Sequence, residues 1–169
     1  LRRTAAVSPK ACFRPAVQAA VQAAVDHTRT AHQGNCSRTI PAPPERVFDA
    51  WLTPEIMTRF LHGHPDHSVT SADSDPKVGG AFRVLMNNGE KDLPHWGEYR
   101  IIDRPKRLEF TWNSAHASPD SIVTLDFRPV DGGTELTLTH DRFPDEGTRD
   151  AHEKGWTCIL EQLERALAA

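Results

Sequence analysis

The chain has 169 residues, 38% of them hydrophobic, and a formal net charge of −3. This length is sufficient for one domain with a substantial core. Residues 1–25 hold four basic and no acidic side chains, which leaves 16 basic against 23 acidic residues from 26 to 169, a charge of about −7. Such a balance argues against a nucleic-acid or anionic-membrane partner. No apolar run approaches the roughly eighteen residues of a membrane span.

The cysteines are few and widely spaced. Cys12, Cys36 and Cys158 form no C-x-x-C pair and are odd in number. Neither a disulfide framework nor a cysteine-rich zinc site is therefore expected. This usage favours a reducing compartment, and we predict a cytoplasmic protein.

The first 35 residues differ in composition from the rest. The segment RPAVQAAVQAAVDH is rich in alanine, with Pro15 suited to a first helical turn and valines on one thin stripe. We expect residues 1–35 to be an extension that is either helical or disordered. Its basic, acid-free start resembles a transit peptide, and a trimmed chain explains it equally well. Residues 36–169 are expected to form the domain.

Strand and helix signals begin at residue 37. SRTIPAP predicts a short strand that is stopped by two prolines. Pro44 then opens PERVFDAWL and Pro54 opens PEIMTRFL, and both segments have apolar residues at helical spacing. Two short helices in tandem are expected.

From residue 81 the apolar residues alternate, as in strands with one buried face. The predicted strands are AFRVLM, WGEYRII, RLEFTW, IVTLDF and TELTLTH. Asn88-Gly89 and Gly132-Gly133 are turn signals between them. Gly79-Gly80 is predicted to be a bulge that starts the curvature of the sheet.

The last segment predicts a long helix. TRDAHEKGWTCILEQLERALA places Trp156, Ile159, Leu160 and Leu163 on one stripe, with His152 one turn before Trp156. The expected fold is α+β: a curved antiparallel sheet wrapped around this C-terminal helix, with the two short helices closing one end.

Five segments resemble, in order and spacing, the SRPBCC or START-like helix-grip superfamily, in its branch of activators of the ninety-kilodalton heat-shock-protein ATPase. They are PAPPERVFDAWLTPE, VGGAFR, HWGEYRIIDRPKRLEFTW, VTLDFRPVDGGTELTLTH and HEKGW. The resemblance covers roughly residues 36–168. The chain departs from it at the start, where the family usually has a longer first strand.

The resemblance implies a deep cavity between the sheet and the long helix that commonly holds apolar or amphipathic small molecules. It does not imply one activity, because its members include lipid carriers, polyketide cyclases, sensors and chaperone activators.

The inward positions of the strands and of the final helix give the candidate ligand-binding residues. His140 interrupts an apolar row of a strand, so it places a polar group on that wall. It either contacts a ligand or is a wall histidine near the strand end whose polar atoms are bonded to backbone or water. The expected lining is Phe82, Val84, Met86, Tyr99, Ile101, Phe110, Trp112, Leu125, Leu138, His140, His152 and Trp156.

Other candidate sites have simpler explanations. HGHPDH could supply three imidazoles to a metal, yet it lies in a loop with only Asp66 beside it, and a solvated loop is preferred. Glu98, Arg100 and Arg83 are expected on the solvated sheet face. We predict no metal and no cofactor.

Three functions follow from these expectations. The leading one is binding of a hydrophobic or aromatic small molecule without evident catalysis. The second is an enzyme of the cyclase or dehydratase kind, with His140 or His152 as acid or base. The third is an interaction module that acts on a chaperone. Pairing of two copies through an edge strand or the N-terminal helix stays open.

Overall fold

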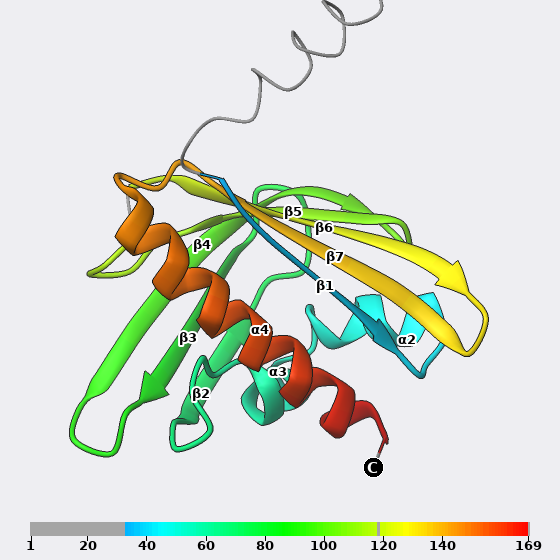
Figure 1. Cartoon of the computed structure of the whole chain (residues 1–169), viewed down its shortest axis with the longest axis horizontal. Coiled ribbons are helices and arrows are strands. Elements are labelled where there is room, and N and C mark those ends of the chain that lie inside the picture. The colour runs from blue at the N-terminus through cyan, green and yellow to red at the C-terminus, as the bar shows by residue number, and fades with distance from the viewer. Residues whose placement is uncertain (1–32, 118, 169) are drawn as a thin grey trace, which may run out of the picture. The chain divides into compact units, whose positions relative to one another are not determined.

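A seven-stranded antiparallel sheet, in the order β1-β7-β6-β5-β4-β3-β2, forms the body of the structure (Figure 1). The structure is a computed structural model that describes residues 33–117 and 119–168. Its strands are β1 (Gly34–Ile40), β2 (Ser68–Ser74), β3 (Ala81–Asn87), β4 (Asp92–Asp103), β5 (Arg107–Trp112), β6 (Ser121–Val130) and β7 (Gly133–Asp141). The predicted helix in the alanine-rich start lies outside the described residues.

Helix α4 (Glu146–Ala168) crosses the inner face of this curved sheet (Figure 1). Its predicted apolar stripe is buried, as are the inward rows of β6 and β7 that include Leu125 and Leu138. Burial of these two surfaces against each other is the main source of stability for such a layered fold. The predicted α+β helix-grip architecture is confirmed.

The two short helices are α2 (Pro44–Ala50) and α3 (Pro54–Phe60), each with a proline in its first turn. Helix α2 contacts β6 and β7, while α3 contacts β2 and α4. The ring of Phe48 packs on Phe127 at 5.1 Å between centroids. The predicted tandem helices are therefore present and join the layers.

The first strand is longer than predicted. Strand β1 begins at Gly34 and pairs with β7 over its whole length, from Gly34 opposite His140 to Ile40 opposite Thr134. Polar residues open this strand, so apolar alternation alone does not mark its start.

Strand β2 was not predicted at all. Its sequence SVTSADS holds only Val69 and Ala72 as partly buried apolar residues, and its register shifts between Val69 and Ser71. It is an edge strand, and polar side chains with a bulge are typical of sheet edges. A weak apolar row is the reason that sequence periodicity did not reveal it.

A bulge in β4 overturns one predicted site residue. The register between β4 and β5 shifts between Tyr99 and Ile101, so the alternation changes phase there. Ile101 is 37% exposed, whereas Ile102 packs against the core. The expectation that Ile101 faces the cavity is wrong.

The predicted bulge at Gly79-Gly80 is instead the turn between β2 and β3. Gly79 has a φ of +82°, a conformation that glycine adopts without strain. The backbone N–H of Gly79 donates to the carbonyl of Tyr99, and the Tyr99 N–H donates to the carbonyl of Gly80. The turn is therefore hydrogen-bonded to β4 at Tyr99, next to the bulge in β4.

Gly97 in β4 offers a test of the inner packing. A Cβ at this position would overlap the carbonyl oxygen of Thr111 and lie 2.6 Å from the ring of Phe82. We expect Gly97→Ala to lower the free energy of unfolding by at least about 2 kcal/mol in urea titrations. Gly147→Ala, in the first turn of α4, is the control and should cost much less. Equal effects would contradict the close packing of Phe82 over Gly97.

Candidate ligand-binding site

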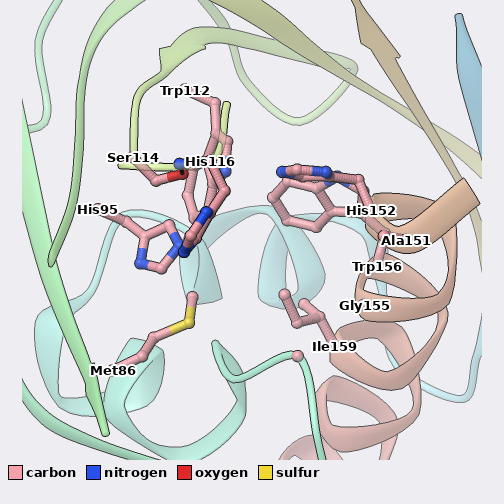
Figure 2. A pocket seen from close by; sticks show the side chains of 11 residues that line it. Met86, His95, Trp112, Ser114, His116, Ala151, His152, Gly155, Trp156 and Ile159 are labelled. Carbon is pink, nitrogen blue, oxygen red and sulfur yellow. Dashed lines mark hydrogen bonds between the residues drawn. The ribbon is translucent and has the colours of Figure 1, made fainter. Parts of the chain in front are cut away.

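A cavity of about 300 Å³ opens to solvent between the sheet and α4. Strands β3, β4 and β5, the loop after β5, the loop after α3 and helix α4 all contribute to it (Figure 2). Its lining residues are Gly63, Met86, His95, Trp112, Ser114, His116, Ala151, His152, Gly155, Trp156 and Ile159.

Two indole rings form the aromatic wall of the cavity. Trp112 ends β5 and Trp156 lies in α4, and their ring centroids are 4.9 Å apart. The ring of His95 packs on Trp112 at 5.0 Å. Both tryptophans are only 3% exposed, so the core holds them in place. Packing in the core therefore restricts the motion of the two rings that border the cavity.

His95 and His152 supply polar atoms to this wall. Nδ1–H of His95 donates to the carbonyl of Leu93 at 3.0 Å, and Nδ1–H of His152 donates to the carbonyl of Thr148 at 2.8 Å. Burial lowers the pKa of His95 to about 4 and also lowers the pKa of His152. Both rings are therefore neutral at neutral pH, and each keeps an unprotonated Nε2.

His140 lies behind Trp156 and is fully buried. Nε1–H of Trp156 donates to Nδ1 of His140 at 3.0 Å, and Nε2–H of His140 donates to Oγ of Ser121 at 2.9 Å. The Ser121 hydroxyl in turn donates to the carbonyl of Trp112 at 2.6 Å. These three bonds link α4 through β7 and β6 to β5.

This arrangement requires a neutral His140. An indole nitrogen can only donate, so Nδ1 of His140 must accept and its hydrogen must be on Nε2. Burial, with a smaller contribution from nearby His152, lowers the pKa of His140 to about 3. Both ring nitrogens are bonded within the protein. His140 is therefore held in the core by two side chains rather than by backbone or water, and its expected place on the cavity wall is wrong.

The structure divides the other predicted site residues into three groups. Those that line the cavity are Met86, Trp112, His152 and Trp156. Those that surround a smaller void of about 10 Å³ are Phe82, Tyr99, Phe110 and again Trp112. Val84, Leu125 and Leu138 are buried in the core and border neither space.

The smaller void is close to the size of one water molecule. Trp51 borders it, and the Trp51 Nε1 atom is buried without a hydrogen-bond partner among the described residues. The Tyr99 hydroxyl, by contrast, is bonded to Oγ of Ser74 at 2.9 Å. Trp112 separates this void from the larger cavity, since it borders both.

His95 and His116 were not predicted as site residues. His95 and Gly97 precede Tyr99 at intervals of two residues. Alternation along the strand therefore predicts that His95 lies on the same face as Tyr99. The predicted strand began at Trp96, and Pro94 obscured its earlier start. His116 lies in an irregular loop, where no periodic pattern indicates direction.

The histidine-rich loop shows no metal-binding geometry. The rings of His64 and His67 are 5.0 Å apart, and Nδ1 of His64 accepts a hydrogen bond from the backbone of Asp66. Within residues 33–117 and 119–168, no group of three or more His, Cys, Asp or Glu side chains is placed to hold a metal ion. No helix in the same residues is long and apolar enough to cross a membrane.

Comparison with known proteins agrees with this fold. A family model described as Activator of Hsp90 ATPase homolog 1-like protein matches residues 41–168. A Chromobacterium violaceum protein of known structure is 24% identical, with a TM-score of 0.75 over 83% of this chain and 99% of that chain. An AHSA1-like protein of Aeromonas hydrophila is 25% identical, with a TM-score of 0.70 over 80% of this chain and 92% of that one. No curated protein matches.

The curved sheet and the long helix across it define a helix-grip fold, and the match to the family model places the chain in the SRPBCC superfamily. Within that class, the chain belongs to the family of Activator of Hsp90 ATPase homolog 1-like proteins, whose model covers most of its length. The predicted resemblance is confirmed.

The bonds through His140 predict how stability changes with pH. Below its ordinary pKa of 6.5 the unfolded chain binds a proton at His140, whereas the folded protein does not until about pH 3. The free energy of unfolding should therefore fall as pH falls across this window. In His140→Phe this fall should be smaller, because one titrating group is gone.

At neutral pH, His140→Phe should itself be less stable by about 1–3 kcal/mol, because Trp156 Nε1 loses its acceptor. Urea titrations across the pH range measure both effects, with His64→Phe in the exposed loop as control. An unchanged pH dependence in His140→Phe would contradict the neutral, buried imidazole.

Proposed function

We propose that the chain binds a hydrophobic or aromatic small molecule in the cavity between the sheet and α4. The observation that carries this proposal is an open cavity with a wall made by Trp112 and Trp156. Concave, mostly apolar sites with a few polar atoms are typical of small-molecule binding. A volume of about 300 Å³ lies at the small end of such sites.

Acid–base catalysis on such a ligand is a second candidate. His95 and His152 each keep an unprotonated Nε2 at the cavity, which is the form a general base needs. His140 has both ring nitrogens bonded in the core and is not available for proton transfer. Turnover of a bound ligand that persists in both His95→Phe and His152→Phe would exclude this mechanism.

Activation of a chaperone ATPase, as the family name describes, is a third candidate. The outer face of β4 exposes Trp96 by 47% and Ile101 by 37%, and large exposed apolar side chains are common at protein contacts. This function would be favoured if the chain stimulates a purified Hsp90 ATPase and Trp96→Ala abolishes the effect. Stimulation that Trp96→Ala leaves unchanged would exclude this surface.

Filling the cavity tests the leading proposal. Ala151 is exposed and lines the cavity from α4, so a larger side chain there occupies ligand space without entering the core. We expect Ala151→Trp to raise the Kd for 2-naphthol by about tenfold or more in calorimetric titrations.

Lys154→Trp is the matched control, because Lys154 is exposed on the same helix and does not line this cavity. It should bind 2-naphthol as the unmodified protein does. Native mass spectrometry of the purified protein, followed by organic extraction, would identify a ligand that copurifies. Equal affinity of both variants would contradict binding in this cavity.

A further inference from the structure

The polar atoms that His95 and His152 present to the cavity are acceptors. A backbone carbonyl only accepts hydrogen bonds, so the bonds to Leu93 and Thr148 fix the single hydrogen of each neutral ring on Nδ1. Nε2 then carries a lone pair. Within the described part of the chain, no group donates to Nε2 of either ring.

The two imidazoles approach the cavity from different elements. His95 comes from β4 and His152 from α4, and Figure 2 shows them on opposite sides of the space, with Trp112 between them. His116, from the loop after β5, is the other titratable group close to both rings. Both rings thus border the same cavity, one from the sheet and one from the helix.

In the described part of the chain, the cavity lining supplies no counter-charge to these acceptors. None of the described residues that line the cavity is Lys, Arg, Asp or Glu. A carboxylate ligand would lose its hydration without gaining a cation, which is costly in a partly buried site. A pure hydrocarbon would cover the two Nε2 atoms and leave them without donors, which also costs binding energy.

We propose that the ligand is a neutral aromatic molecule that carries hydroxyl groups, and that these donate to Nε2 of His95 and His152 while its ring packs on Trp112 and Trp156. The proposal rests on the cavity being a ligand site, as inferred above. It narrows the ligand class to phenol-like compounds and separates them from ethers, acids and hydrocarbons with the same rings.

The test compares three probes with one ring system at neutral pH by calorimetry. 2-Naphthol can donate a hydrogen bond, 2-methoxynaphthalene cannot, and 2-naphthoate is an anion. We expect 2-naphthol to bind about tenfold more tightly than 2-methoxynaphthalene, since one net hydrogen bond is lost. 2-Naphthoate should bind most weakly.

Substitutions of His95 and His152 test whether these two rings cause the preference for 2-naphthol. His152→Phe and His95→Phe keep a ring and remove the acceptor. Because 2-naphthol has one hydroxyl and donates to one ring at a time, at least one of these variants should reduce its preference, and the double variant should abolish it. His152→Gln restores an acceptor and should recover part of it. His64→Phe, outside the cavity, should change nothing.

The results distinguish a failure of the proposed ligand class from a failure of the proposed binding function. If 2-naphthol and 2-methoxynaphthalene bind equally and Ala151→Trp weakens both, the cavity is a ligand site and the inference on ligand class is overturned. Tightest binding of 2-naphthoate overturns it as well. A preference that survives in the double His→Phe variant overturns the role of the histidines. If none of the three probes binds, the proposed function fails together with the inference.

Discussion

The hydrogen-bonded chain from Trp156 through His140 and Ser121 to the carbonyl of Trp112 fixes helix α4 on the sheet. The donor and the acceptor of each bond in this series are fixed, because the indole at one end can only donate and the carbonyl at the other end can only accept. Every donor finds one acceptor, so three buried polar groups are satisfied inside an apolar core. This series of hydrogen bonds begins at Trp156 and ends at Trp112, the two tryptophans of the cavity wall. The same bonds that hold the helix therefore determine the shape of the cavity.

Neutral histidines are the second consequence of this packing. Burial lowers the pKa values of His95, His140 and His152, and each ring has its hydrogen placed by a specific acceptor. In His140 that hydrogen is on Nε2, and in the other two it is on Nδ1. The core histidine thus has no free nitrogen, while the two cavity histidines offer lone pairs. Such a lining, with acceptors and no charged side chain among the described residues, favours the neutral hydrogen-bond donors of the proposed ligand class.

Much of this fold could be predicted because its main surfaces are periodic. Alternation in β3, β5, β6 and β7 and the stripe of α4 identified the layers, and the inward side of His140 was correct. Whether an inward residue borders a cavity or lies in the core depends on how neighbouring side chains pack. The periodicity of the sequence gives no information on this packing. The bulge that turns Ile101 outward, the polar edge strand β2 and the early start of β4 before Pro94 are local departures from alternation. His95 was missed for this reason, and it is half of the proposed polar site.

The most direct test of this account is ¹⁵N NMR of the histidine side chains at neutral pH, with resonances assigned through single variants. We predict that His140 carries its hydrogen on Nε2, that His95 and His152 carry theirs on Nδ1, and that all three rings are neutral. A protonated His140, or a His140 with its hydrogen on Nδ1, would contradict the bond from Trp156. Hydrogens on Nε2 of His95 and His152 would contradict the acceptor site in the cavity.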